Sequence, residues 1–189
     1  MSFNLILNPN ANLWNSFLKG DKLAFERLYK QYADHLLRYG LKISGDRRLL
    51  EDCMHDLFVE LWSSRSRLSP LPDENIKFYL FKALRYKILQ SKKASDAIDF
   101  VEWDDFTRFP SANLSENETD SREREDATST QLRKEIKKLP KRQQEAIYLR
   151  FYQQFTNDEV AVIMGVTYQS ACRFIYKGLK VLHEVIKVD

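Results

Sequence analysis

Residues 155–170 read FTNDEVAVIMGVTYQS, and this stretch decides how the last third of the chain folds. Thr156 with Glu159 three residues later is a capping-box pattern, which predicts the start of a helix with an apolar face. Gly165 suits the left-handed conformation just past a helix end, and a second helix opens two or three residues later. Two short helices around a tight turn are typical of a helix-turn-helix, whose second helix enters the DNA major groove. An ordinary helical hairpin within a core is the alternative.

The composition is that of a globular protein. The chain has 189 residues, of which 43% are hydrophobic and 30% charged, enough for one or two small domains with cores of their own. No apolar run approaches the roughly 20 residues of a membrane span, and the N-terminus lacks the pattern of a signal peptide. We therefore expect a cytoplasmic protein without direct membrane insertion. Cys53 and Cys172 lack metal-ligand spacing, so reduced thiols are expected.

Charge alternates along the chain although the net charge is only +3. Residues 1–95 carry 16 Lys/Arg against 10 Asp/Glu, residues 96–131 carry 3 against 11, and residues 132–189 carry 11 against 6. Two basic blocks thus flank an acidic connector. Basic blocks attract phosphate backbones, whereas an acidic connector avoids them or seeks a basic groove.

The chain reads as almost entirely helical, because it has only five glycines and five prolines and no convincing alternating strand. We expect an all-α fold of two small helical domains joined by a flexible acidic linker. The predicted boundaries are 1–95 for the first domain, 96–130 for the linker and 131–189 for the second domain. Within the first domain, Asp21 caps the second helix and Gly45 ends it, and further helices cover about 47–62 and 75–92. Within the linker, the acidic and aromatic stretch 100–106 either packs on a domain or docks into a partner.

Motifs for catalysis are missing from the sequence. It contains no G-x-S-x-G, no P-loop and no glycine-rich phosphate cradle, and its three histidines are far apart without metal spacing. We therefore expect no enzyme activity, catalytic residue, metal, cofactor or small-molecule substrate.

The predicted helix 75–92 combines cations with aromatic rings. Lys82 and Arg85 lie near Phe78 and Tyr86 in sequence. Rings can stack on the bases of a single strand while cations pair with its phosphates. The alternative is that the rings belong to the core and the lysines are merely solvated, which we favour for Tyr79.

Several motifs together resemble those of bacterial sigma factors. AFERLY at 24–29, LEDCMHDLFVELW at 50–62 and YLFKALR at 79–85 look like successive signatures of sigma domain 2. LPKRQQ at 139–144 and the helix-turn-helix look like sigma domain 4. The whole resembles the extracytoplasmic-function (ECF) subfamily of RNA polymerase sigma factors. This resemblance implies an initiation factor that binds core RNA polymerase, melts the −10 element and reads the −35 element of a promoter.

The resemblance also implies site residues and partners. In the family, the third helix of domain 2 docks on the clamp of the polymerase β′ subunit, which maps here onto Asp52, His55, Asp56, Val59, Glu60 and Trp62. The −10 element is held by the fourth helix and the loop before it, with Phe78, Lys82, Arg85 and Tyr86 as candidates. The −35 element is read from Thr167, Tyr168, Gln169, Ser170 and Arg173, with Lys177 and Lys180 on phosphates. Further implied partners are the β flap, an anti-sigma factor and the RNA exit channel, which the linker would thread.

Three residues depart from the family pattern. Tyr86 stands where members usually have Asn, and Cys172 and Phe174 stand where basic residues are common. These departures bear on which promoter is read. Two other classes of function stay open on sequence grounds: a free-standing helix-turn-helix regulator, and a degenerate sigma-like protein that occupies polymerase or an anti-sigma factor without opening promoters.

Overall fold

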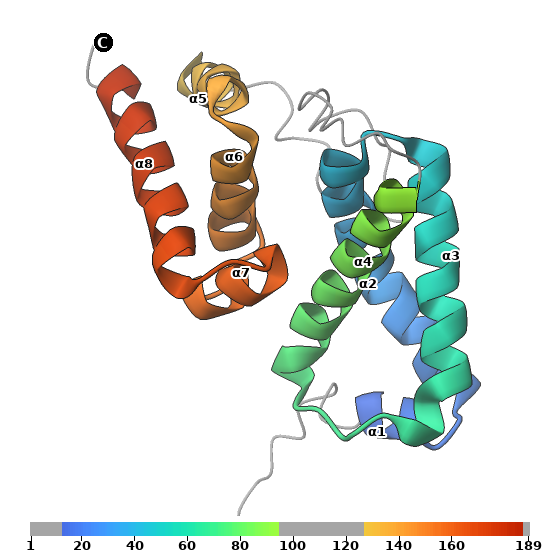
Figure 1. Ribbon diagram of the computed structural model, residues 1–189. Coiled ribbons are helices and arrows are strands. Elements are labelled where there is room, and N and C mark those ends of the chain that lie inside the picture. The colour runs from blue at the N-terminus through green and yellow to red at the C-terminus, as the bar shows by residue number, and fades with distance from the viewer. Residues whose placement is uncertain (1–12, 95–126, 187–189) are drawn as a thin grey trace, which may run out of the picture. The chain divides into compact units, whose positions relative to one another are not determined.

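In the computed structural model, the described residues are 13–94 and 127–186, and they form helices joined by short loops with no strand among them (Figure 1). The chain divides into two compact units, residues 1–99 and residues 100–189. Nearly all of the predicted linker, including the stretch 100–106, lies outside the described residues. The all-α prediction is confirmed.

In the first unit, capping residues mark where the helices begin and end. The Asp21 carboxylate accepts a hydrogen bond from the Leu23 amide at 2.8 Å and so caps the second helix, while Gly45 ends it with a φ of 65°. Asp46 then caps the third helix. The elements are α1 (Leu13–Leu18), α2 (Lys22–Ser44), α3 (Arg47–Ser64), the 3-10 turn η1 (Arg65–Arg67) and α4 (Asp73–Ala94).

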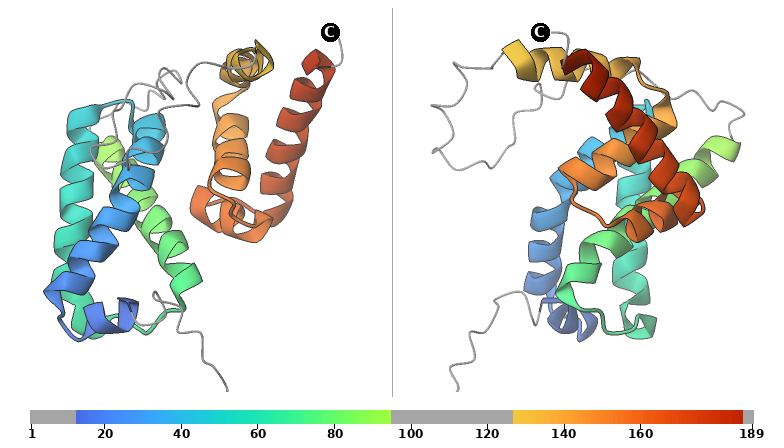
Figure 2. Two further views of the ribbon diagram at one scale, coloured as in Figure 1. Left: turned by 180° about the vertical axis from the view of Figure 1, so that it is seen from behind. Right: turned by 90° about the vertical axis from the view of Figure 1, so that its left-hand side faces the viewer.

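The three long helices α2, α3 and α4 pack against one another, and α1 lies across one end of them beside η1 (Figures 1 and 2). The α2–α3 contact is close at Gly40, where any Cβ would overlap the buried side chain of Leu50. Aromatic rings fill the α1 end. Phe25 lies 5.8 Å from Phe17 and 5.1 Å from Trp62, measured between ring centroids.

The second unit is built around its last helix. Its elements are α5 (Ala127–Lys138), α6 (Lys141–Ile147), the π-helical turn η3 (Tyr148–Tyr152), α7 (Asn157–Met164) and α8 (Tyr168–Ile186). The last residues of the predicted linker are thus helical. Helices α5, α6 and α7 all contact α8. At Gly178 the backbone of α8 approaches α6 so closely that a Cβ would lie 2.5 Å from Ile147 Cδ1.

None of the described helices combines the length and the apolarity that a bilayer span requires.

Candidate functional site

The helix-turn-helix of the second unit forms as its sequence predicts. Thr156 Oγ1 accepts a hydrogen bond from the Glu159 amide at 3.3 Å, and the Glu159 carboxylate accepts one from the Thr156 amide at 2.7 Å. Gly165 adopts a φ of 63°, the left-handed conformation expected there. Thr167 Oγ1 then accepts from the Ser170 amide at 3.2 Å, which fixes the start of α8.

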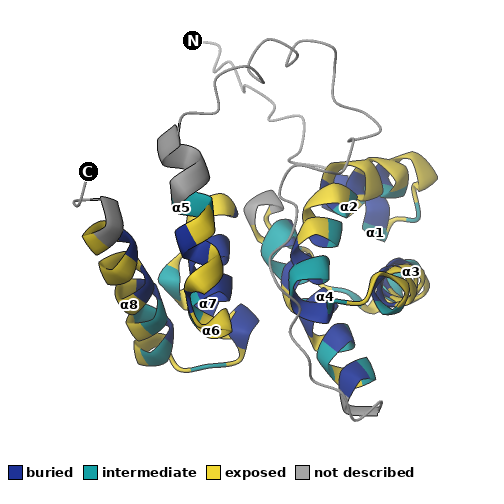
Figure 3. Cartoon of the chain, turned by 90° about the horizontal axis from the view of Figure 1, so that it is seen from above, coloured by how far each residue is buried: buried dark blue, intermediate teal, exposed yellow. Residues whose placement is uncertain are grey.

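Helix α8 buries one narrow stripe, and most of its other residues are exposed (Figure 3). The buried stripe consists of Ala171, Ile175, Gly178 and Leu182. Nearly all the sequence candidates for −35 contact lie on the exposed side: Thr167, Tyr168, Gln169, Arg173, Lys177 and Lys180 are exposed, and Ser170 is half-buried. Gln169, Arg173, Lys177 and Lys180 follow one another at spacings of three or four residues, so these four side chains share one exposed surface of α8.

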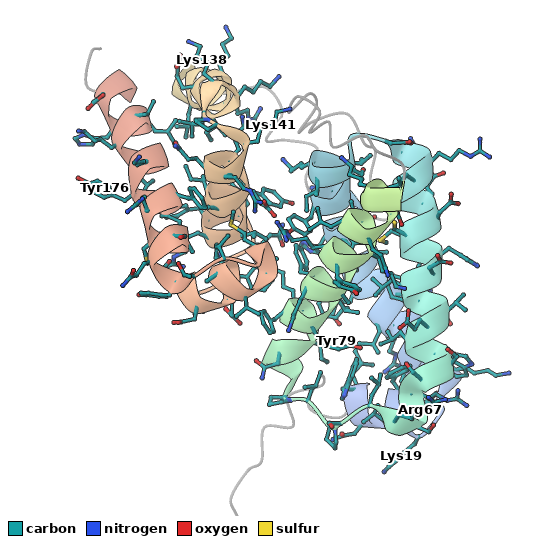
Figure 4. The ribbon with its side chains drawn as sticks, in the orientation of Figure 1. Lys19, Arg67, Tyr79, Lys138, Lys141 and Tyr176 are labelled. Carbon is teal, nitrogen blue, oxygen red and sulfur yellow. The ribbon has the colours of Figure 1, made fainter. Side chains whose placement is uncertain are left out.

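Tyr176 belongs to that surface and was missed by the sequence analysis. Its side chain is 69% exposed (labelled in Figure 4). It follows Arg173 by three residues and precedes Lys180 by four, so the three share one helix face. An aromatic residue in an amphipathic helix is usually counted as core, but its spacing from the two cations could have revealed it.

The departures at Cys172 and Phe174 flank this surface rather than fill it, since both side chains are half-buried. Asn157 Nδ2 donates to Cys172 Sγ at 3.5 Å and links α7 to α8. The hydrogen bond with the neighbouring Cys172 side chain raises the pKa of the Tyr168 hydroxyl above its usual value.

Helix α4 places its four candidates differently. Lys82 is exposed, Tyr86 is 67% exposed and Phe78 is half-buried. Arg85 is only 6% exposed, which differs from the expectation that it contacts DNA. The physical reason is that α4 contacts α1, α2 and α3, so its buried face is wide enough to include Arg85.

Helix α3 presents the predicted docking residues on its outer face. Asp52, His55, Asp56 and Glu60 are exposed, and Val59 is 52% exposed although it is apolar. Trp62 is half-buried beside Phe25.

An apolar groove of about 760 Å³ runs between α2 and α3, next to these docking residues. Tyr29, Phe58, Val59 and Trp62 are among its apolar walls, and His55 lies at its side. The outer face of α3 therefore combines a row of exposed carboxylates with an apolar groove.

No group of three or more His, Cys, Asp or Glu side chains in the described ranges could hold a metal ion.

Comparison with known families accounts for both halves of the chain. Residues 28–97 match the family model of sigma-70 region 2, and residues 129–182 match that of sigma-70 region 4. Together the matches span more than half of the chain. The chain belongs to the sigma-70 family. Its succession of region 2 and region 4 places it in the ECF subfamily, as the sequence resemblance predicts.

Solved structures share the fold of this sigma factor. CnrH in complex with the cytosolic domain of CnrY matches with a TM-score of 0.57 and 14% identity, over 95% of this chain and 98% of that chain. The sigma factor RpoE from Bartonella quintana, in complex with the anti-sigma factor NepR, matches with a TM-score of 0.56 and 18% identity, over 87% and 98%. A search of curated proteins finds no match.

The first unit of this sigma factor also has a basic end, formed by residues that are far apart in sequence. Gly20, with a φ of 90°, turns the chain after α1, and Arg65 Nε lies 3.5 Å from the position that a Cβ on Gly20 would take. This contact brings the exposed Lys19 and Arg67 to the same end (Figure 4). Lys19 and Arg67 are 48 positions apart, so no local pattern could have predicted that they lie at the same end.

The loop after η1 is held against α1. Trp14 Nε1 donates to the Ser69 carbonyl at 3.0 Å, and the Arg65 guanidinium lies 4.4 Å from the centre of the Trp62 ring. These contacts fix the path of the segment that leads into α4.

Region 2 further contains an ion pair between its third and fourth helices. Lys87 Nζ of α4 donates to Glu60 Oε2 of α3 at 2.5 Å. Tyr79 lies near the pair: burial raises the pKa of its hydroxyl, Glu60 raises it further, and Lys87 lowers it.

Proposed function

We propose that this sigma factor binds core RNA polymerase, directs it to specific promoters, melts the −10 element with α4 and reads the −35 element with α8. The observation that carries the proposal is the presence of regions 2 and 4 in one chain, each with an exposed surface of cations and aromatic rings.

Recognition of the −35 element is assigned to the first turns of α8. Residues near the start of a recognition helix reach base edges, whereas those further along contact the backbone. Gln169 and Arg173 are placed for bases, with Tyr168 and Ser170 beside them, and Lys177 and Lys180 for phosphates. Tyr176 adds an apolar contact of the kind that a thymine methyl group accepts.

Melting of the −10 element is assigned to Lys82 and Tyr86, with Phe78 beside them and the basic end formed by Lys19 and Arg67. Extruding a base costs a few kcal/mol, and stacking on one ring returns about 1–3 kcal/mol. Tyr86, in place of the usual Asn, offers a large exposed ring for such stacking.

Docking on polymerase is assigned to the outer face of α3 on the β′ clamp, with region 4 on the β flap. The boundary 96–130 for the linker, and its path through the RNA exit channel, remain part of this proposal. Because the similar RpoE structure contains an anti-sigma factor, we also propose an anti-sigma partner that competes for these surfaces in the cytoplasm.

The deciding experiment is reconstituted transcription. The purified chain is mixed with core polymerase from its own host and a genomic fragment library, and the 5′ ends of the transcripts are sequenced. Starts that share −35 and −10 elements support the proposal and reveal the promoter. Silence despite polymerase binding indicates a degenerate sigma-like protein. Silence without polymerase binding indicates a free-standing DNA-binding regulator.

The docking face has its own test. We expect the double change Asp52→Ala, Asp56→Ala to weaken polymerase binding in a pull-down titration, while circular dichroism shows unchanged helix content, because both side chains are exposed. Glu26→Ala is the matched control, since it removes an exposed carboxylate on α2 that pairs with Lys30. Unchanged polymerase affinity in the double variant would mean that the docking face is wrongly placed.

A further inference from the structure

The ion pair between Glu60 and Lys87 joins two surfaces that act on different partners. Glu60 belongs to the exposed row on α3 that we assign to polymerase, one turn after Asp56. Lys87 directly follows Tyr86, which we assign to the melted strand. The two side chains are 27 residues apart in sequence and meet only because α3 packs on α4.

The environment of the pair is uneven. The Glu60 side chain is 67% exposed, whereas the Lys87 side chain is 21% exposed. A docking partner can therefore reach the carboxylate directly. The lysine is largely covered, and its charge is close enough to the half-buried Tyr79 to lower the pKa of that hydroxyl.

A pair of this kind is easily exchanged. An ion pair with a solvated carboxylate contributes little to stability, so a competing cation on a docking partner can take the carboxylate at little cost. A lysine released in this way gains a new partner where phosphates are close, and the counterions it displaces favour that contact.

We propose that Lys87 is a phosphate contact for the melted strand, and that Glu60 holds it until a basic side chain of polymerase takes the carboxylate. The inference rests on the proposed function, because it needs α3 to face polymerase and α4 to face the strand. In the free protein the pair adds no net charge to the strand-binding face. In the complex, Lys87 adds one positive charge to α4, one residue after Tyr86.

The first test uses the free chain and needs no polymerase. Binding of a labelled, mixed-sequence single-stranded 15-mer is measured by fluorescence anisotropy across a range of salt concentrations. Glu60→Gln is expected to tighten binding roughly threefold to fivefold at low salt and to steepen the salt dependence by about 0.7 in log–log slope, the effect of one added phosphate contact on a single strand. Lys87→Gln alone is expected to change little, and in the Glu60→Gln background it is expected to remove the gain.

The matched control is Glu26→Gln, which also frees a lysine from an exposed carboxylate in the same unit, but on α2. We expect no change in strand affinity from this control. An equal gain from Glu26→Gln, or a Glu60→Gln gain that persists without Lys87, would overturn the assignment of Lys87 as a phosphate contact.

The second test uses the complex with core polymerase. There, Lys87→Gln is expected to weaken strand binding roughly threefold to fivefold, and Glu60→Gln is expected to give no further gain. Equal effects of Lys87→Gln in the free chain and in the complex would overturn the release by docking. A chain that fails to bind polymerase contradicts the proposed function instead. In that case the strand-binding measurements on the free Glu60→Gln and Lys87→Gln variants still decide the role of Lys87.

Discussion

Helices α4 and α8 are the two nucleic-acid candidates of this sigma factor, and they are embedded in opposite ways. On α8 a single stripe is buried and most polar side chains face outward. On α4 the buried set is wide and includes two cations. Its buried members are Ile76, Leu80, Phe81, Leu84, Arg85, Ile88 and Lys92.

This difference in burial shows that a lysine or arginine on a helix does not by itself indicate a contact with DNA. On a helix with a narrow buried stripe, a cation is outside almost by default. On a helix surrounded by three others, a cation can become structural. Lys92 shows this directly, because its buried ammonium donates to the Ile43 carbonyl at 2.9 Å. Arg85, in the same row of α4, is buried to a similar degree.

The largest expected effect concerns Arg85. We expect Arg85→Ala to lower the free energy of unfolding of region 2 by about 2–4 kcal/mol, because the packing of its buried side chain is lost. Lys82→Ala, on the exposed face of the same helix, should change it by less than about 0.5 kcal/mol. Urea unfolding followed by circular dichroism measures both. Equal stabilities would mean that the buried side chain of Arg85 contributes no more to the stability of region 2 than an exposed lysine of the same helix.

For Arg173 on α8 we expect an effect on DNA recognition and none on stability. We expect Arg173→Ala to weaken use of the −35 element by about 1–3 kcal/mol, as loss of a base contact does, while leaving stability unchanged. The measurement is transcription from templates with single −35 substitutions. Glu184→Ala, exposed near the far end of α8, serves as the control. Undiminished −35 selectivity would remove Arg173 from the base-reading set.

The smallest effect concerns the helix that supports α8. We expect Thr156→Ala to destabilise region 4 by about 1 kcal/mol, because the amide of Glu159 loses its capping acceptor. Thr156→Ser keeps a hydroxyl and should cost much less. Thermal unfolding compares the two variants. A serine variant as unstable as the alanine variant would show that the cap contributes through its methyl group rather than its hydrogen bond.

Local signals were readable from the sequence because they act over three or four residues. The capping box at Thr156, the helix ends at Gly45 and Gly165 and the exposed face of α8 all follow from such spacing. The apolar stripe of α3 was equally predictable, since its period of 3.6 residues alone separates the core from the docking face.

What the sequence could not supply depends on packing between distant segments. The burial of Arg85 follows from how many helices surround α4. The meeting of Lys19 with Arg67 requires the turn at Gly20 to lie against η1. The pair between Glu60 and Lys87 requires the register of α3 on α4. None of these three features can be predicted from the local spacing of apolar and polar residues.

The position of Trp62 makes its intrinsic fluorescence a reporter of binding at the proposed docking face. The ring is half-buried at the edge of the α2–α3 groove, whereas Trp14 is sealed from water at 1% exposure and region 4, residues 129–182, contains no tryptophan. A partner that covers the docking face should therefore displace water from Trp62 and shift its emission to shorter wavelength. Trp14 should keep its emission unchanged, so that in a Trp103→Phe variant, which removes the third tryptophan, binding at this face can be followed without any label.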